Sequence, residues 1–172
     1  TQLATIQIDF AMPKRFNLVY TDVDGSEKHP VMVHRAILGS FERFIMLLIE
    51  HTAGKFPVWL APEQIRVISV NQEDSTLDFA AKVAEQAKQL GLRIHIDISK
   101  ESVGKKIRAS QVDKVPYTIV VGDKEIESGQ VMPRIRQDMA VQEGDPAVHV
   151  DEFLKTVANE AKSRVHKTSL HG

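Results

Sequence analysis

The residues best suited to binding chemistry in this sequence are a histidine, a glycine–serine pair and an arginine that fall between positions 34 and 43. Gly39 and Ser40 are typical of a turn, and Ser40 is a good helix N-cap. Arg43 then falls in the first turn of the predicted helix, where the helix dipole favours anions over cations. An arginine placed there is most easily explained if it meets an anion such as a phosphate, and Gly39 lets a ligand approach the backbone closely. The stretch therefore indicates an anion site.

A polar strand face precedes this stretch. Residues 3–10 alternate between apolar and polar side chains, which predicts a half-buried strand whose polar face carries Thr5, Gln7 and Asp9. That face is either exposed to solvent or forms the floor of a polar pocket, because Gln7 offers donors and an acceptor to a small ligand. The strand alone leaves both interpretations open.

A basic strip is the third candidate. Lys105, Lys106 and Arg108 fall in a predicted helix over 103–112, and Lys114 follows it. Such a strip suits phosphates, but it is also what an ordinary solvated helix face contains. The net charge is -1, so any contact with RNA must come from local patches of this kind.

The first third of the chain must position the earlier residues. It predicts strands over 3–10, 17–21 and 30–34 in an antiparallel meander, with a hairpin turn at 22–25. A helix then follows Ser40 and ends at Gly54. Residues 56–62 contain two prolines and predict an extended linker. We therefore expect domains at 1–55 and 63–172, joined by a linker at 56–62.

Beyond the linker, strands and helices alternate. The pattern predicts strands over 65–70, 93–98 and 117–121, helices over 77–90, 103–112 and 150–165, and one or two edge strands over 125–136. Such alternation predicts an α/β fold with a mixed, mostly parallel sheet flanked by helices.

Composition excludes several classes. Of the 172 residues, 42% are apolar and 26% are charged, as in ordinary globular proteins. The absence of cysteine excludes disulfides and Cys-based zinc sites within this chain. No apolar run has the roughly 18–20 residues of a membrane span. We expect a cytoplasmic protein without a membrane partner, and a start inside a strand suggests a piece of a longer chain.

The stretch from Gly39 to Arg43 resembles motif 3 of class II aminoacyl-tRNA synthetases, in which a Gly-rich strand end leads into a helix bearing an arginine. The longer run 30–40 is similar to threonyl-tRNA synthetases in particular. Further similarity to that family lies at 5–10, 56–62, 115–117 and 121–125. The resemblance covers nearly the whole chain and fades after about residue 136. It implies the end of a class II catalytic domain followed by a class II anticodon-binding domain.

The family joins threonine to tRNA through a threonyl-adenylate, using ATP with Mg²⁺ and a zinc ion that holds the amino acid. The resemblance places His34 on one of the zinc ligands, the others lying outside this chain. It places Arg43 on the ATP-site arginine and Gln7 on a threonine-contacting position, and these two are the catalytic candidates. The other implied ATP-binding positions are Gln2, Thr5 and Ser40. Adenylate formation is an in-line displacement that needs positioning and charge neutralisation.

The second domain is implied to bind tRNA(Thr), and the resemblance places Glu125 and Arg134 on anticodon-reading positions. Lys100 stands where the family has an asparagine that reads a base, and Lys114 replaces a frequent arginine. The tRNA candidates are therefore Lys100, Lys105, Lys106, Arg108, Lys114, Glu125 and Arg134. Residues 132–141 also depart from the family pattern, so base reading is expected to differ in detail.

We expect the parent protein to be a homodimeric synthetase, and this segment not to be catalytically competent alone, because motif 2 and two zinc ligands are missing. The alternative is a stand-alone anticodon-domain-like module that binds RNA or a protein, and a weaker one is a synthetase-derived scaffold. Since Ile6, Ile8 and Phe44 are apolar, residues 1–55 are expected to be less ordered than 60–165, or covered by a neighbouring chain.

Overall fold

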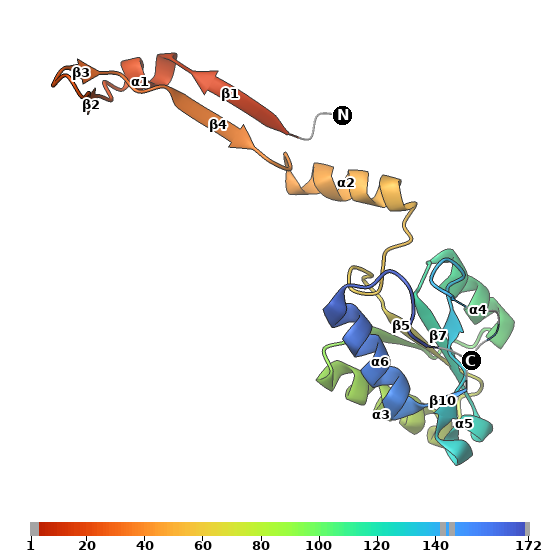
Figure 1. Ribbon diagram of the computed structural model, residues 1–172. Helices are drawn as coiled ribbons and strands as arrows, with labels where there is room; N and C mark the ends of the chain where they lie inside the picture. Colours follow the sequence, from red (N-terminus) through yellow and green to blue (C-terminus); the bar gives the residue numbers. More distant parts are fainter. Residues whose placement is uncertain (1–3, 142–143, 145–146, 171–172) are drawn as a thin grey trace. The chain divides into compact units, whose positions relative to one another are not determined.

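The computed structural model describes residues 4–141, 144 and 147–170. The chain divides into two units, the first over residues 1–53 and the second over residues 54–172. Figure 1 follows both units in sequence colours. Gln2, one of the predicted ATP-binding residues, lies outside the described residues.

The first unit is built on one long pair of strands. β1 (Thr5–Asp9) pairs antiparallel with β4 (Met32–Ala36). Between them come α1 (Ala11–Arg15) and the small hairpin of β2 (Tyr20–Thr21) and β3 (Glu27–Lys28). The predicted antiparallel pairing is confirmed, but the meander order is wrong, because β1 pairs with β4 and β2 with β3.

Local chemistry explains this difference. The turn closes early, since the Asp22 N–H donates to the Ser26 carbonyl at 2.8 Å and Lys28 forms an ion pair with Asp22. Asp9 also caps an unpredicted helix, because its Oδ1 accepts from the N–H groups of Ala11 (2.8 Å) and Met12 (2.9 Å). The chain therefore leaves β1 through α1 and does not turn directly into a second strand.

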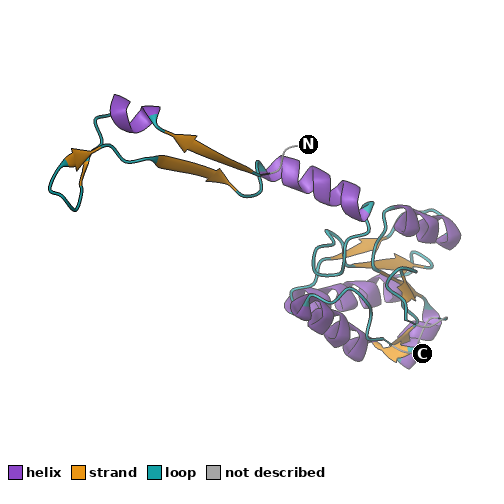
Figure 2. Ribbon diagram, turned by 45° about the horizontal axis from the view of Figure 1, so that its top comes forward, coloured by secondary structure: helices purple, strands orange, loops and turns teal. Residues whose placement is uncertain are grey.

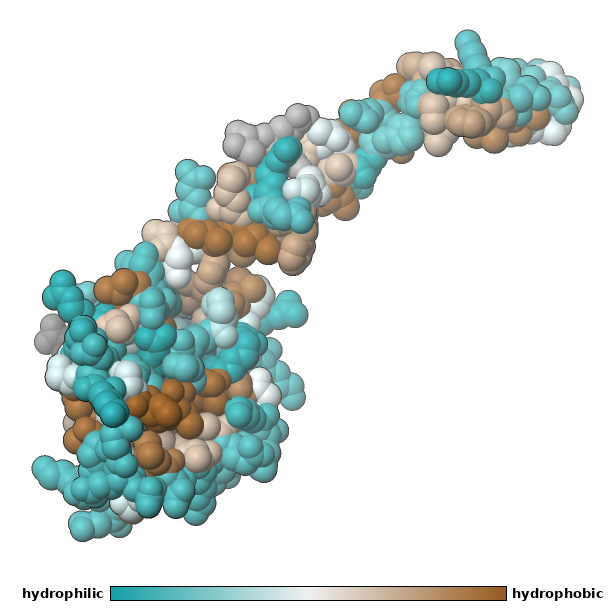
Figure 3. Space-filling view, turned by 180° about the vertical axis from the view of Figure 1, so that it is seen from behind, coloured by the Kyte–Doolittle hydropathy of each residue, from teal (hydrophilic) through white to brown (hydrophobic). Residues whose placement is uncertain are grey.

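α2 (Phe41–Thr52) begins where the sequence predicts. The Ser40 hydroxyl accepts from the Arg43 N–H at 3.2 Å, and the helix ends at Ala53 and Gly54, which both have left-handed φ angles of 51° and 74°. No residue of α2 is buried, and Pro13 is the one buried residue among the described residues of the first unit. Apolar side chains remain exposed, such as Ile6 at 69% and Phe41 at 75%, and Figure 3 shows brown surface along this unit. The first unit therefore has apolar faces but no core of its own.

The second unit is a three-layer α/β domain. Its sheet has the order β6-β5-β7-β9, comprising β6 (Ile94–Asp97), β5 (Ile65–Ser69), β7 (Tyr117–Val121) and β9 (Arg134–Ile135). β5, β6 and β7 are parallel and β9 is antiparallel. The predicted mixed, mostly parallel sheet is confirmed.

Helices cover both faces of this sheet. α3 (Asp74–Gln89) and α6 (Val150–Ser163) lie on one face and α4 (Val103–Val112) lies on the other, as Figures 1 and 2 show. This follows from right-handed crossovers that run in opposite directions along the sheet, from β5 to β6 through α3 and from β6 to β7 through α4. α5 (Asp123–Ser128) follows β7, and β8 (Gln130–Val131) pairs with β10 (Val148–His149). The core includes Val67, Ile119 and Phe153, all fully buried.

Two predictions for this unit need correction. Residues 125–128 form part of α5, not an edge strand, because the Glu125 carboxylate accepts from the Gly122 N–H at 2.9 Å and caps the helix. Residues 56–62 are not extended, since the N–H groups of Leu60 and Ala61 both donate to the Pro57 carbonyl at 3.0 Å. Val58 is buried in this segment, so it packs as part of the second unit.

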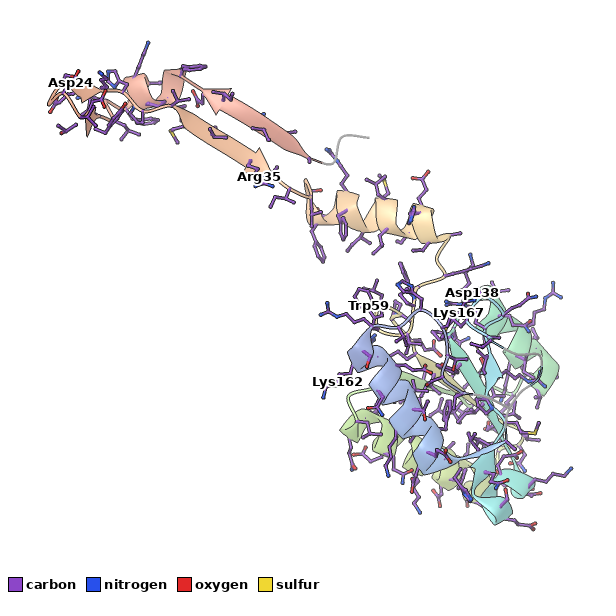
Figure 4. The ribbon with its side chains drawn as sticks, in the orientation of Figure 1. Asp24, Arg35, Trp59, Asp138, Lys162 and Lys167 are labelled. Atoms are coloured by element: carbon purple, nitrogen blue, oxygen red, sulfur yellow. The ribbon has the colours of Figure 1, made fainter. Side chains whose placement is uncertain are left out.

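The segment after α6 folds back onto the same unit. The buried Glu160 carboxylate accepts from Tyr117 Oη, from Thr168 Oγ1, and from the backbone N–H and hydroxyl of Ser169. Lys167 Nζ donates to the Asp138 carbonyl at 2.6 Å, and these two residues lie side by side in Figure 4. Over the described residues, no helix is long and apolar enough to cross a membrane.

Candidate functional site

The polar face of the β1–β4 pair brings two predicted residues together. Gln7 lies directly opposite His34 in the register, so both side chains project from the same face. Thr5 lies on this face at the end of the pair nearest the turn to Ser40, opposite Ala36. The pair therefore assembles a polar surface from both strands, as the floor of a pocket requires, although most of it is exposed.

Asp9 is a member of this surface that the site predictions omitted. Its Oδ2 lies 3.2 Å from His34 Nε2. The hydrogen bond from the Met12 N–H is the largest influence on Asp9 and lowers the pKa of its carboxyl, opposed by desolvation and assisted by Ala11 and His34. The carboxylate therefore stays ionised and orients the His34 ring through Nε2, which leaves Nδ1 for another partner.

The described residues do not complete a metal site by themselves. The described residues contain no group of three or more His, Cys, Asp or Glu side chains that could hold a metal ion. A structural or catalytic zinc needs three or four protein ligands. His34 supplies one imidazole nitrogen, and Asp9 is occupied with capping α1 and orienting His34.

Ser40 and Arg43 are brought together at the start of α2. The Ser40 hydroxyl accepts from the Arg43 N–H, so capping positions the residue that carries the guanidinium. Arg43 lies in the first turn, as predicted, next to the unpaired N–H groups that favour an anion. Arg43 therefore lies where the sequence predicts, and its contact with an anion stays a prediction.

The basic strip on α4 loses one member in the structure. Lys106 is only 3% exposed, and its Nζ donates to the carbonyls of Ser69 (3.1 Å) and Asp97 (3.2 Å) at the ends of β5 and β6. Lys105 and Arg108 are exposed, with Lys105 in an ion pair with Glu101. The predicted phosphate contact for Lys106 is therefore wrong, because a residue that satisfies buried carbonyls is not available to RNA.

Two predicted anticodon residues lie at the carboxyl ends of the parallel strands. Lys100 follows β6 and is exposed, and Glu125 is in the first turn of α5 after β7. This edge of an open α/β sheet is where ligands commonly bind. Glu125 already caps α5 through one carboxylate oxygen, so its other oxygen is the one available to a base.

The other two lie in a separate cavity of about 650 Å³, on the α4 side of β9. Arg134 is opposite Thr118 in the register, near the start of β7, and Lys114 follows α4 with a left-handed φ of 58°. Both basic residues line the cavity together with the apolar side chains of Ile107, Val115 and Ile135. The structure thus sorts the anticodon candidates into two groups at opposite ends of β7.

Sequence reasoning missed two residues of this cavity, Lys55 and Arg136. The sequence does not single out Arg136, because nothing in its local pattern distinguishes it from the neighbouring Arg134. The sequence predicts Lys55 to be in the first domain, whereas it belongs to the second unit. The two prolines that follow Lys55 do not indicate that the Phe56 carbonyl accepts a hydrogen bond from Arg136.

Comparisons with known proteins agree with the division of the chain into two units. A family model described as the anticodon binding domain matches residues 64–160. A model described as the tRNA synthetase class II core domain (G, H, P, S and T) matches residues 1–52. The chain therefore belongs to the class II aminoacyl-tRNA synthetases, and joins a core segment to an anticodon-binding domain.

Within that class, threonine–tRNA ligases share a high sequence identity with this chain. The threonine–tRNA ligase of Clostridium botulinum (strain Hall) is 46% identical over 96% of this chain, and that of Thermotoga maritima is 45% identical over 99%. The RNA binding domain of threonyl-tRNA synthetase from Cryptosporidium parvum superposes with a TM-score of 0.72 at 34% identity, covering 99% of this chain and 41% of that one. The chain belongs to the threonyl-tRNA synthetase family, and spans 25% of the C. botulinum relative and 26% of the T. maritima one.

Proposed function

We propose that this chain is the tRNA-reading part of a threonine–tRNA ligase, together with a segment that contributes to its amino acid and ATP site. The observation that carries this proposal is the cavity that Lys114 and Arg134 line together with the apolar side chains of Ile107, Val115 and Ile135. Apolar side chains accommodate a splayed base, and the cations suit both phosphates and the acceptor edge of guanine. Glu125 and Lys100 would meet further bases of the same single-stranded loop.

The first unit would contribute to activation of threonine. In this proposal Arg43 neutralises charge on the ATP phosphates, with Thr5, Ser40 and Gln2 on the nucleotide side and Gln7 at threonine. Preorganised cations that meet developing charge are the usual source of rate enhancement in such displacements. The Mg²⁺ would enter with ATP.

Zinc would be shared with residues beyond this chain. His34 would supply one ligand, oriented by Asp9, and the ion would hold the threonine amino and hydroxyl groups and so reject valine. The described residues offer no complete site. We therefore propose that the 172-residue chain has no threonine-dependent pyrophosphate exchange, and that the homodimeric, cytoplasmic parent enzyme does.

Binding of an anticodon stem-loop tests the proposal. The purified chain is titrated with a labelled tRNA(Thr) stem-loop and with the same stem-loop carrying another anticodon. We expect tighter binding of the threonine anticodon, with each lost base contact costing about 1–3 kcal/mol. Equal affinity for both stem-loops would refute anticodon reading.

A stand-alone binding module is the second candidate. The observation that favours it is the completeness of the second unit, which has its own core, beside a first unit without one. This candidate predicts RNA affinity with no dependence on the anticodon sequence, so the same titration separates the two.

A further inference from the structure

The guanidinium of Arg136 holds three parts of the second unit together. It donates to the Lys114 carbonyl through Nη1 at 2.7 Å and to the Phe56 carbonyl through Nη2 at 2.8 Å. It also meets both carboxylate oxygens of Asp138, through Nε at 2.6 Å and Nη2 at 3.1 Å. These contacts use four of the five N–H groups of an arginine, and the side chain is 11% exposed. Arg136 is therefore committed to its protein neighbours.

Fixing the Phe56 carbonyl also fixes the residues just before it. Lys55 lines the same cavity as Lys114 and Arg134. Gly54 has a φ of 74°, and a Cβ placed on it would lie 3.6 Å from Cδ of Lys114. The segment 54–56 is thus held against Lys114 on one side and Arg136 on the other, and Lys55 at its middle lines the cavity.

We propose that Lys55 is a further RNA contact of this cavity, and that Arg136 is the positioning residue that holds it there. The inference rests on the proposed function and adds a residue to its RNA site. Lys55 supplies a flexible cation suited to a phosphate, in the cavity whose apolar side chains suit a base. Arg136 acts through hydrogen bonds to carbonyls, so its own charge is neutralised by Asp138 and is not offered to the RNA.

Arg93 provides a matched control. It anchors the same segment at its other end, donating through Nε to the Ala61 carbonyl at 2.9 Å and through Nη2 to the Trp59 carbonyl at 3.0 Å. It does not line the cavity of Lys55. Replacing either arginine would disturb the packing of residues 56–62. Only the replacement of Arg136 would release Lys55 from its place in the cavity.

The test is a double-mutant cycle on stem-loop binding by the 172-residue chain, at 50 and 200 mM salt, with Lys55→Ala, Arg136→Gln and Arg93→Gln. We expect Lys55→Ala to weaken binding several-fold at low salt. Its deficit should shrink by about 2.5-fold at the higher salt, because one contact to a single-strand phosphate contributes about 0.7 to the salt slope. Arg136→Gln should weaken binding by a similar factor. The double variant Lys55→Ala/Arg136→Gln should bind no more weakly than the weaker-binding of the two single variants.

The inference is wrong if Lys55→Ala binds the stem-loop as tightly as the unsubstituted chain does. It is wrong, too, if the losses of affinity caused by Lys55→Ala and Arg136→Gln multiply in the double variant. It is also wrong if Arg93→Gln behaves as Arg136→Gln does. If Arg136→Gln fails to fold, Arg136→Lys keeps the cation but reaches fewer acceptors, and the same lack of additivity is required of it. Failure of the unsubstituted chain to bind refutes the proposed function itself.

Discussion

Replacing Glu160 by alanine should unfold the second unit at much lower denaturant. The carboxylate is 3% exposed and accepts four hydrogen bonds, from Tyr117 Oη at 2.5 Å, Thr168 Oγ1 at 3.0 Å, and the N–H (2.5 Å) and hydroxyl (2.8 Å) of Ser169. No basic side chain is paired with it among the ion pairs of the described residues. It is therefore the acceptor that fastens the segment after α6 to β7.

The size of the loss follows from the groups left behind. Tyr117 is 0% and Thr168 is 4% exposed, so water reaches neither hydroxyl easily. Each buried donor left without an acceptor costs about 1–3 kcal/mol. The Thr168 hydroxyl is left as such a donor, since Tyr117 Oη can still donate to Thr168 Oγ1 at 2.8 Å. With the other hydrogen bonds to the charged acceptor also lost, we expect a loss of about 3–5 kcal/mol in the free energy of unfolding.

The assay is urea unfolding followed by the fluorescence of Trp59, which is the one tryptophan of the chain and lies in the second unit. With a slope of about 2 kcal/mol per molar urea, the midpoint should fall by about 2 M. Glu160→Gln keeps an acceptor oxygen and should lose less than half as much. Glu101→Ala, which breaks an exposed ion pair with Lys105, should change stability by less than about 0.5 kcal/mol. A loss below about 1 kcal/mol for Glu160→Ala would refute the reasoning.

Three further predictions concern charge and order. Burial, and then the negative charge of Glu160, raises the pKa of Tyr117 far above its ordinary 10.0; above about pH 10 the unfolded chain therefore binds fewer protons, and stability should fall by about 1.4 kcal/mol per pH unit in excess of the fall measured for Tyr117→Phe. Lys106→Met should lower the thermal midpoint by several degrees and leave the salt slope of RNA binding unchanged. Arg108→Ala should leave the thermal midpoint unchanged and reduce the salt slope if Arg108 meets a phosphate. Amide exchange should be fast throughout residues 5–52 of the isolated chain and slow in β5 and β7, and equal protection of the two units would contradict the lack of a core in the first.

The sequence predicts the second unit well, because its elements are fixed by local periodicity. The strand over 117–121 and the helix over 103–112 have the predicted bounds, since each joins a clear apolar pattern to a cap or a turn. The helix over 123–128 is not apparent from the sequence, because Glu125 caps it through a contact with the backbone N–H of Gly122, three residues away.

The pairing of the first unit could not be predicted from local signals. The contact between Asp22 and Ser26 fixes a tight hairpin. Whether the flanking residues extend this hairpin depends on which strand pairs with β1. That pairing joins Gln7 to His34, 27 residues further along the chain. The same limit applies to Lys106, whose sequence neighbours are exposed and basic while its own side chain points to the ends of β5 and β6. Burial is a tertiary property, and composition does not reveal it.

The most direct test of the account is to map where RNA touches the chain. The ¹⁵N-labelled chain is titrated with the tRNA(Thr) anticodon stem-loop, and amide chemical shifts are followed. The account predicts shifts at Lys114, Arg134 and Glu125. Shifts confined to the smaller cavity beside α3 and α6, at Lys82 and His149, would contradict it.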